Sequence, residues 1–238
     1  MSILQNKVAY ITGGSKGIGL GIAKALLDKG MRVAITSRTL QSAKDAAESL
    51  TSDSSRILAL QSDTSSMDSE RAAVEAVIRH FGQLDVAVAN AGVGHFAPFE
   101  DLTEQQWKET IDTNLTGVFN SVKASLKALK ASKGYVITIA SLAGTNFFEN
   151  GTAYNASKFG LVGFSQALML DVRKHGIKVT TIMPGSVATA FGDHQVTDKD
   201  AWKIQPEDIG EMVVGLLEMN PRTLPSKIEV RPAVPGKG

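Results

Sequence analysis

The first third of the chain alternates between short apolar runs and segments of helical character. The apolar runs are rich in β-branched residues and lie at residues 7–12, 31–36, 57–60 and 84–89. Helical segments stand between them, at residues 20–27, 40–50 and 66–81. Runs without a polar face are typical of strands buried on both sides of a parallel sheet, joined by right-handed crossovers. The pattern therefore predicts an α/β fold on a parallel sheet.

The second half of the chain continues the alternation. Thr103 followed by Gln106 is a capping signal for a long helix that we expect to run past Asn114 to about Lys130. Further strands are expected at residues 135–140, 176–183 and 228–230, and further helices at about 152–174 and 206–218. The helix at 152–174 is apolar around most of its circumference. Because the sheet covers one face, the other predicts a homodimer or homotetramer.

One long segment, residues 186–205, shows no regular pattern and places Phe191 and Trp202 among polar residues. A loop of this length is usually a lid or a disordered excursion. Its position after a strand, at the edge where a ligand would bind, favours a substrate lid. No repeat, linker or low-complexity tract suggests a second domain. We expect a single domain over residues 1–238, with the lid at about 186–205.

Composition excludes several kinds of function. The net charge is +1, which offers no electrostatic reason to expect nucleic acid or an anionic membrane as partner. Without cysteine there are no disulfides and no cysteine-based metal sites, and the scattered histidines lack metal-ligand spacing, so no metal is expected. The N-terminal residues do not resemble a secretory signal, and no apolar run approaches membrane-spanning length. We expect a cytoplasmic protein with no membrane partner.

The first predicted strand ends in the glycine-rich turn Gly13-Gly-Ser-Lys-Gly17-Ile-Gly19, and a helix follows. Such a turn lets the backbone approach a pyrophosphate, while the helix N-terminus offers unpaired N–H groups and the positive end of its dipole. The spacing is Gly-x-x-x-Gly-x-Gly rather than Gly-x-Gly-x-x-Gly. The alternative is that these glycines merely allow the helix to pack on the sheet.

Candidate nucleotide contacts follow each of the first four strands, at Gly13, Arg38, Asp63 and Asn90. Ligands of such sheets bind beyond the carboxyl ends of the strands, so a dinucleotide is expected there.

The end of the second strand predicts which dinucleotide binds. An acidic residue at this position would accept hydrogen bonds from the adenine ribose and repel a 2′-phosphate. The residue here is Ser37, its neighbour is Arg38, and residues 31–41 contain no carboxylate. A guanidinium can hold a phosphate, and Lys16 in the glycine turn would add a second cation. We therefore predict NADP(H). The alternative is that Arg38 is a solvated surface arginine and that Lys16 merely starts the helix.

Residues 141–158 contain a candidate acid–base site. Tyr154 and Lys158 are four residues apart, so on a helix they share one face. A fixed ammonium one turn away favours the phenolate and is expected to lower the pKa of the tyrosine toward the range useful for acid–base catalysis. Ser141 follows the strand at 135–140, where its hydroxyl could hydrogen-bond a substrate carbonyl. Asn114, inside an apolar stretch of helix, is either functional or a satisfied buried amide.

Together these motifs resemble the short-chain dehydrogenase/reductase family in its short soluble form. The resemblance covers residues 6 to about 219 and rests on Thr12-Gly-x-x-x-Gly-Ile-Gly19, Asn90-Ala-Gly92, Asn114, Ser141, Tyr154-x-x-x-Lys158 and Pro184-Gly185. It implies a Rossmann-type, doubly wound parallel sheet of seven strands in the order 3-2-1-4-5-6-7, with helices on both faces.

The resemblance also implies a catalytic quartet. In it, Tyr154 protonates the carbonyl oxygen as the nicotinamide delivers hydride to carbon, and Ser141 orients and polarises that carbonyl. Lys158 binds the nicotinamide ribose and lowers the pKa of the tyrosine, while Asn114 holds a water of the proton relay. The predicted cofactor-binding residues are Gly13, Ser15, Lys16, Gly17, Ile18, Gly19, Ser37, Arg38, Thr39, Asp63, Thr64, Asn90, Ala91, Gly92, Tyr154, Lys158, Pro184, Gly185, Val187 and Thr189.

These features predict an NADP(H)-dependent oxidoreductase acting on a ketone, an aldehyde or a 3-oxoacyl group, or on the corresponding secondary alcohol. Residues 225–238 lack the glycine-rich acidic turn of reductases for carrier-bound 3-oxoacyl groups, which argues against that subgroup. An apolar small-molecule substrate is expected from the candidate pocket residues His95, Phe96, Leu142, Phe147, Phe148, Phe191 and Trp202.

Two alternatives remain. A non-catalytic NADP-binding sensor on the same fold would not need the Ser–Tyr–Lys arrangement. An epimerase or dehydratase of the extended relatives would need a larger C-terminal substrate region than this chain has.

Overall fold

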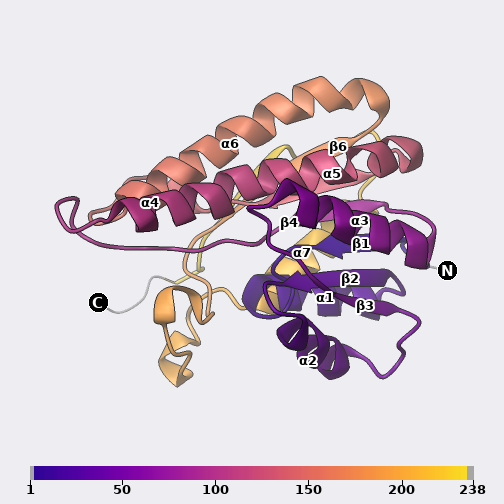
Figure 1. Ribbon diagram of the computed structural model, residues 1–238, viewed down its shortest axis with the longest axis horizontal. Coiled ribbons are helices and arrows are strands. Elements are labelled where there is room, and N and C mark those ends of the chain that lie inside the picture. Colours follow the sequence, from indigo (N-terminus) through magenta and orange to yellow (C-terminus); the bar gives the residue numbers. More distant parts are fainter. Residues whose placement is uncertain (1–2, 235–238) are drawn as a thin grey trace.

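Seven parallel strands form one sheet in the order β3-β2-β1-β4-β5-β6-β7 in the computed structural model, which describes residues 3–234 (Figure 1). The strands are Val8–Ile11 (β1), Arg32–Ser37 (β2), Ile57–Gln61 (β3), Val86–Ala89 (β4), Tyr135–Ile139 (β5), Lys178–Pro184 (β6) and Lys227–Val230 (β7). This order and direction confirm the predicted sheet. Of the domain expected over residues 1–238, residues 1–2 and 235–238 lie outside the described part of the chain.

Helices cover both faces of the sheet (Figure 1). They are Gly17–Asp28 (α1), Leu40–Leu50 (α2), Met67–Phe81 (α3), Glu104–Ile111 (α4), Gly117–Ser132 (α5), Thr152–Val172 (α6) and Pro206–Glu218 (α7). The core on one face is built from α1, α2 and α7, and the core on the other from α3, α5 and α6. Because helices cover both faces, every residue of the central strands β1, β4 and β5 is buried. Within residues 3–234, no helix is both long and apolar enough to span a membrane.

The long helix expected from Thr103 to Lys130 is present and contains one π-helical turn. Thr103 does form the predicted capping box with Gln106 at the start of α4. A π-helical turn, Asp112–Thr116, then separates α4 from α5. The predicted long helix is therefore confirmed, and the π-helical turn inside it is the feature that the sequence did not predict. The turn is centred on the buried Asn114, whose side-chain amide hydrogen-bonds the backbone of Val93 after β4. The spacing of apolar residues along the chain does not predict such a contact.

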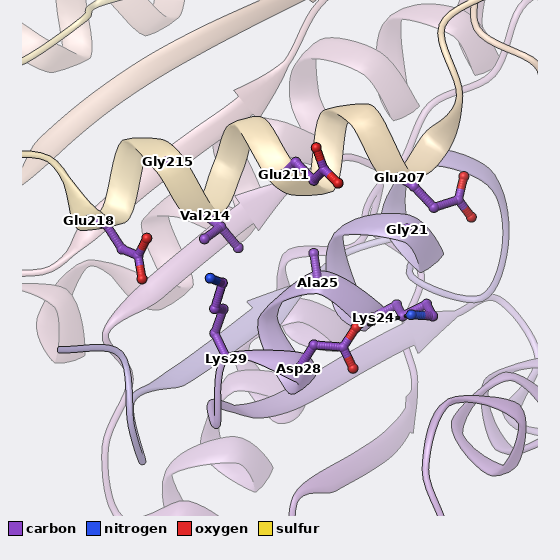
Figure 2. Close-up of a pocket in the computed structure, with 10 residues that line it drawn as sticks. All are labelled: Gly21, Lys24, Ala25, Asp28, Lys29, Glu207, Glu211, Val214, Gly215 and Glu218. Carbon is purple, nitrogen blue, oxygen red and sulfur yellow. Dashed lines mark hydrogen bonds and ion pairs between the residues drawn. The ribbon is translucent and has the colours of Figure 1, made fainter. Parts of the chain in front are cut away.

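Helices α1 and α7 approach one another through glycines. A Cβ atom added at Gly21 would lie 2.5 Å from the Pro206 carbonyl oxygen, and one at Gly210 would lie 2.7 Å from the Gly21 carbonyl oxygen. The two helices also border a hollow of about 470 Å³, which Lys24, Asp28 and Glu211 help to line (Figure 2). This close packing holds α1 in place, and the N-terminus of α1 lies at the carboxyl edge of the sheet.

Candidate active site

The glycine turn after β1 is tied to the end of β4 by Asn90. The Asn90 side-chain amide donates hydrogen bonds to the carbonyl oxygens of Thr12, at 2.9 Å, and Gly13, at 3.0 Å. In return, the Thr12 hydroxyl accepts from the N–H groups of Asn90, at 3.0 Å, and Ala91, at 3.1 Å. Two loops from neighbouring strands are thereby joined into one unit at the carboxyl edge of the sheet.

The glycines of this turn are required by the close approach of these loops. Gly13 adopts a φ of 62°, which favours glycine. A Cβ atom on Gly19 would lie 2.4 Å from the Gly13 carbonyl oxygen and 2.6 Å from the Asn90 Nδ2 atom. Packing of the chain therefore explains by itself why glycine is needed at these positions, in agreement with the alternative hypothesis that the glycines serve packing.

The start of α1 nonetheless suits an anion. Lys16 occupies the N-cap position without a side-chain capping bond, and the first turn of α1 contains no acidic residue. The first N–H groups of a helix lack partners within the helix and carry the positive end of its dipole. The residues present therefore fit a pyrophosphate at this position.

The predicted cofactor residues are all at the carboxyl edge of the sheet or on the elements that border it. Gly13, Ser15, Lys16, Gly17, Ile18 and Gly19 lie in the turn after β1 and the start of α1; Ser37, Arg38 and Thr39 end β2 and cap α2; Asp63 and Thr64 follow β3; Asn90, Ala91 and Gly92 follow β4; Pro184, Gly185, Val187 and Thr189 end and follow β6. Thr189 reaches the glycine turn, since its Cγ2 atom would lie 3.1 Å from a Cβ atom on Gly17. Their roles as cofactor contacts stay predictions.

Arg38 faces a residue that the sequence analysis missed. Its side chain is 76% exposed, and its Nη1 atom lies 3.7 Å from the Oε1 atom of Glu109 on α4. The other carboxylate oxygen of Glu109 lies 3.1 Å from the Nε2 atom of His95. No sequence signal marked Glu109, because its neighbours are brought to it from β2 and from the loop after β4.

Tyr154 and Ser141 meet at the end of β5. Ser141 caps the short 3₁₀ turn Leu142–Gly144, where its Oγ atom accepts a hydrogen bond of 3.1 Å from the Ala143 N–H group. Burial raises the pKa of Tyr154 to about 12, and the nearby Ser141 hydroxyl opposes this shift without cancelling it.

Lys158 lies one turn further along α6. It is buried, and its Nζ atom donates a 3.1 Å hydrogen bond to the Ile139 carbonyl oxygen and lies 5.6 Å from the centre of the Tyr154 ring. Burial lowers the pKa of Lys158 to about 8. The predicted lowering of the tyrosine pKa by this ammonium is therefore wrong for this structure, because loss of solvent dominates at both groups.

Asn114 is fully buried in the π-helical turn. Its Nδ2 atom donates to the Val93 carbonyl oxygen at 2.9 Å and to the Ser157 hydroxyl at 3.0 Å, and its Oδ1 atom accepts from the Val93 N–H group at 2.8 Å. The side chain thus matches the satisfied buried amide considered as an alternative. It joins the loop after β4 to α6, beside Lys158.

Three phenylalanine rings surround the ring of Tyr154. The ring centres of Phe96, Phe191 and Phe148 lie 5.4, 5.7 and 6.4 Å from that of Tyr154. Phe147, another predicted pocket residue, instead stacks on Phe159 at 5.0 Å and is 82% exposed. The cluster of Phe96, Phe148 and Phe191, called the aromatic wall below, thus gives the candidate active site an apolar side.

The segment at 186–205 is closed at its base. The Ala188 N–H group donates to the Ile204 carbonyl oxygen at 2.9 Å, and the Ile204 N–H group donates to the Ser186 carbonyl oxygen at 3.1 Å. Inside the segment, the buried carboxylate of Asp200 lies 2.9 Å from the Nε2 atom of His194 and 2.6 Å from the Nζ atom of Lys203. The bond with Lys203 is the main reason that the pKa of Asp200 falls well below its usual range.

Fold and site together define an α/β protein with a candidate active site around Tyr154 at the carboxyl edge of its parallel sheet. The sequence profile of the family described as short chain dehydrogenase matches residues 7–200. A D-threitol dehydrogenase of Mycolicibacterium smegmatis is 37% identical over 196 residues, which are 82% of this chain and 75% of that protein. A glycine betaine reductase of Emericella nidulans is 30% identical over 96% of this chain, but the chain spans 19% of that protein's length.

Solved structures agree with this match. An alcohol dehydrogenase from the archaeon Thermococcus sibiricus, complexed with 5-hydroxy-NADP, has a TM-score of 0.90 and 29% identity, with 96% of this chain and 97% of that chain covered. A 3-ketoacyl-(acyl-carrier-protein) reductase from Brucella melitensis, complexed with NADH, has a TM-score of 0.87 and 25% identity, with 97% and 98% covered. The chain therefore belongs to the short-chain dehydrogenase/reductase family and is an oxidoreductase of that family.

The burial of Lys158 predicts a pH-dependent stability. Its pKa is about 8 in the folded chain and 10.5 for a lysine in water, so between these values the unfolded state binds more protons and stability rises with pH. Relative to Lys158→Met, the free energy of unfolding of the native protein should rise by about 3 kcal/mol across this window. Urea unfolding from about pH 7 to about pH 11 measures the difference. The control is Lys174→Met, which removes an exposed lysine and should leave the pH dependence of stability unchanged. If the difference in unfolding free energy between the native protein and Lys158→Met were also independent of pH, the assignment would be contradicted.

Proposed function

We propose that this protein is an NADP(H)-dependent reductase of ketones or aldehydes, or a dehydrogenase of the corresponding secondary alcohols. The observation that carries the proposal is the grouping of the Ser141 hydroxyl, the Tyr154 phenol and the Lys158 ammonium, with Lys158 one turn from Tyr154 on the same helix. A non-catalytic sensor on the same fold has no use for this arrangement.

The side chains would share the work as follows. A bound nicotinamide dinucleotide supplies hydride chemistry. Tyr154, with a pKa raised to about 12, holds its proton at neutral pH and donates it to the carbonyl oxygen of the substrate. The Ser141 hydroxyl hydrogen-bonds the same oxygen, and the Lys158 ammonium stabilises the phenolate that proton transfer leaves behind. In the reverse direction the phenolate is the base, so alcohol oxidation is favoured by higher pH.

Asn114 enters the proposal with a positioning role. Its amide is bonded to Val93 and Ser157, so it fixes the loop after β4 against α6 next to Lys158. The water-holding role implied by the family resemblance stays a prediction.

Arg38 and Lys16 support NADP(H) as the cofactor. Ser37 takes the place where a carboxylate would repel a 2′-phosphate, and the exposed Arg38 beside it can pair with one. One solved relative carries a modified NADP and another carries NADH, so the family alone does not decide between them.

The aromatic wall supports an apolar substrate. Phe96, Phe148 and Phe191 remain 37–47% exposed while they contact the Tyr154 ring, which leaves apolar surface beside the proton donor. Phe191 belongs to the segment at 186–205 and packs against the loop after β4. One of its ring atoms would lie 2.6 Å from a Cβ atom on Gly94. We therefore retain this segment as the substrate lid. Assays with ketones, aldehydes, diketones and acyl thioesters will identify the substrate.

A homodimer or homotetramer remains part of the proposal. Helices α5 and α6 lie side by side on one face (Figure 1), where Phe119 of α5 and Phe164 of α6 are in edge contact. Phe119 is 45% exposed and Leu170 is 55% exposed, so apolar surface remains on both helices. Light scattering at micromolar concentration measures the oligomeric state, and a monomer would refute the proposed homo-oligomer.

Changing Tyr154 to Phe tests the catalytic assignment. The substitution removes the phenolic proton and keeps the ring among its aromatic neighbours, so turnover should fall by ~10²–10⁴-fold while NADPH binding changes little. Turnover is followed by NADPH oxidation, and binding by NADPH fluorescence. Tyr135→Phe, which removes the buried phenol bonded to Thr180, is the control and should keep turnover close to native. Full activity of Tyr154→Phe would show that another group is the acid.

The cofactor assignment is tested by comparing kcat/KM for NADPH and NADH. The native enzyme should prefer NADPH, because each charge-assisted contact to the 2′-phosphate contributes about 1.5–3 kcal/mol. In Ser37→Asp/Arg38→Leu this preference should be lost or reversed by more than tenfold. Arg71→Leu, which removes an exposed arginine on α3, is the control. A native preference for NADH would overturn the assignment.

The lid assignment is tested with Phe191→Ala. Removing a partly exposed ring from the aromatic wall should raise KM for an apolar carbonyl substrate by about three- to tenfold, with the Kd for NADPH nearly unchanged. Phe147→Ala is the matched control, since this ring stacks on Phe159 instead of contacting Tyr154. An equal KM for the two variants would remove Phe191 from the substrate site.

A further inference from the structure

Glu109 holds the arginine that we assign to the 2′-phosphate. The Arg38 Nη1 atom lies 3.7 Å from Glu109 Oε1, which is within ion-pair range and beyond a good hydrogen bond. Arg38 comes from the end of β2 and Glu109 from α4, so the pair spans the carboxyl edge of the sheet. A hollow of about 250 Å³ at this place is bordered by both side chains, together with Asp63 and Asp112.

The carboxylate of Glu109 is fixed from its other side. His95 Nε2 lies 3.1 Å from Glu109 Oε2, so Glu109 keeps a partner when Arg38 moves away. Arg38 is the more exposed of the two, since its side chain is 76% exposed and that of Glu109 is 35% exposed. Nearby, Lys108 is paired with Asp112 one turn along. Arg38 is thus the cation that a phosphate arriving here would meet, and Glu109 is the anion already beside it.

We propose that Glu109 is a specificity-determining residue that competes with the 2′-phosphate of NADP(H) for Arg38. The proposal rests on the proposed function, since NADH has no 2′-phosphate to compete. A phosphate carries more charge than a carboxylate and can be held bidentately by a guanidinium, so it displaces Glu109. Each binding event then includes breaking the Arg38–Glu109 pair. Glu109 therefore weakens NADP(H) binding and leaves NAD(H) binding almost unaffected.

Glu109→Gln is the test, because it removes the charge and keeps a side chain that can still bond His95. The Kd for NADPH, measured by fluorescence titration, should fall by about three- to tenfold, and the Kd for NADH should change by less than about twofold. Glu104→Gln removes a carboxylate from the exposed first turn of the same helix and is the matched control. It should leave both constants close to native.

A double variant separates competition from simple repulsion. In an Arg38→Leu background there is no guanidinium to release, so Glu109→Gln should no longer tighten NADPH binding. Equal tightening with and without Arg38 would show that Glu109 only repels the phosphate, and the competition would be refuted. Native preference for NADPH with an unchanged Kd in Glu109→Gln would refute this inference and leave the proposed function standing. A native enzyme that prefers NADH would overturn both.

Discussion

The hydrogen bonds between Asn90 and Thr12 and Gly13 are the constraint on which the rest of the site depends. They join the turn after β1 to the loop after β4, so these two loops are held together at the carboxyl edge of the sheet. The next contact in the same direction is Asn114, which bonds Val93 in that loop and Ser157 on α6. The loop of residues 90–93 thereby connects the glycine turn to the helix that carries Tyr154 and Lys158.

Burial has opposite consequences for the two catalytic candidates. It raises the pKa of Tyr154 to about 12, which keeps the phenol protonated, and lowers that of Lys158 to about 8, which makes its charge costly. Lys158 nevertheless retains a backbone acceptor at Ile139. In the proposed mechanism, Tyr154 is therefore the acid and Lys158 is the cation that would stabilise its phenolate.

The two ends of the carboxyl edge differ in chemistry. Beside Tyr154, the aromatic wall offers apolar surface contributed by three separate segments of the chain. At the end of β2, Arg38, Glu109 and Asp63 make a solvent-exposed charged region. His95 and Phe96 are adjacent in the chain, and they contact the charged end and the apolar end respectively. The loop after β4 therefore borders both ends of the site.

The sequence by itself determined the sheet and the local motifs. Fully apolar runs specify strands buried on both faces, and the glycine turn, the Thr103 capping box and the Tyr154–Lys158 spacing are all local signals. Tertiary structure alone decided the π-helical turn at Asn114, the partners of Glu109 and the different environments of Phe147 and Phe191. It also decided the direction of the Tyr154 pKa shift, which spacing suggested would be downward. Each of these depends on contacts between segments far apart in the chain, and on how completely water is excluded, and neither quantity has a local signature in sequence.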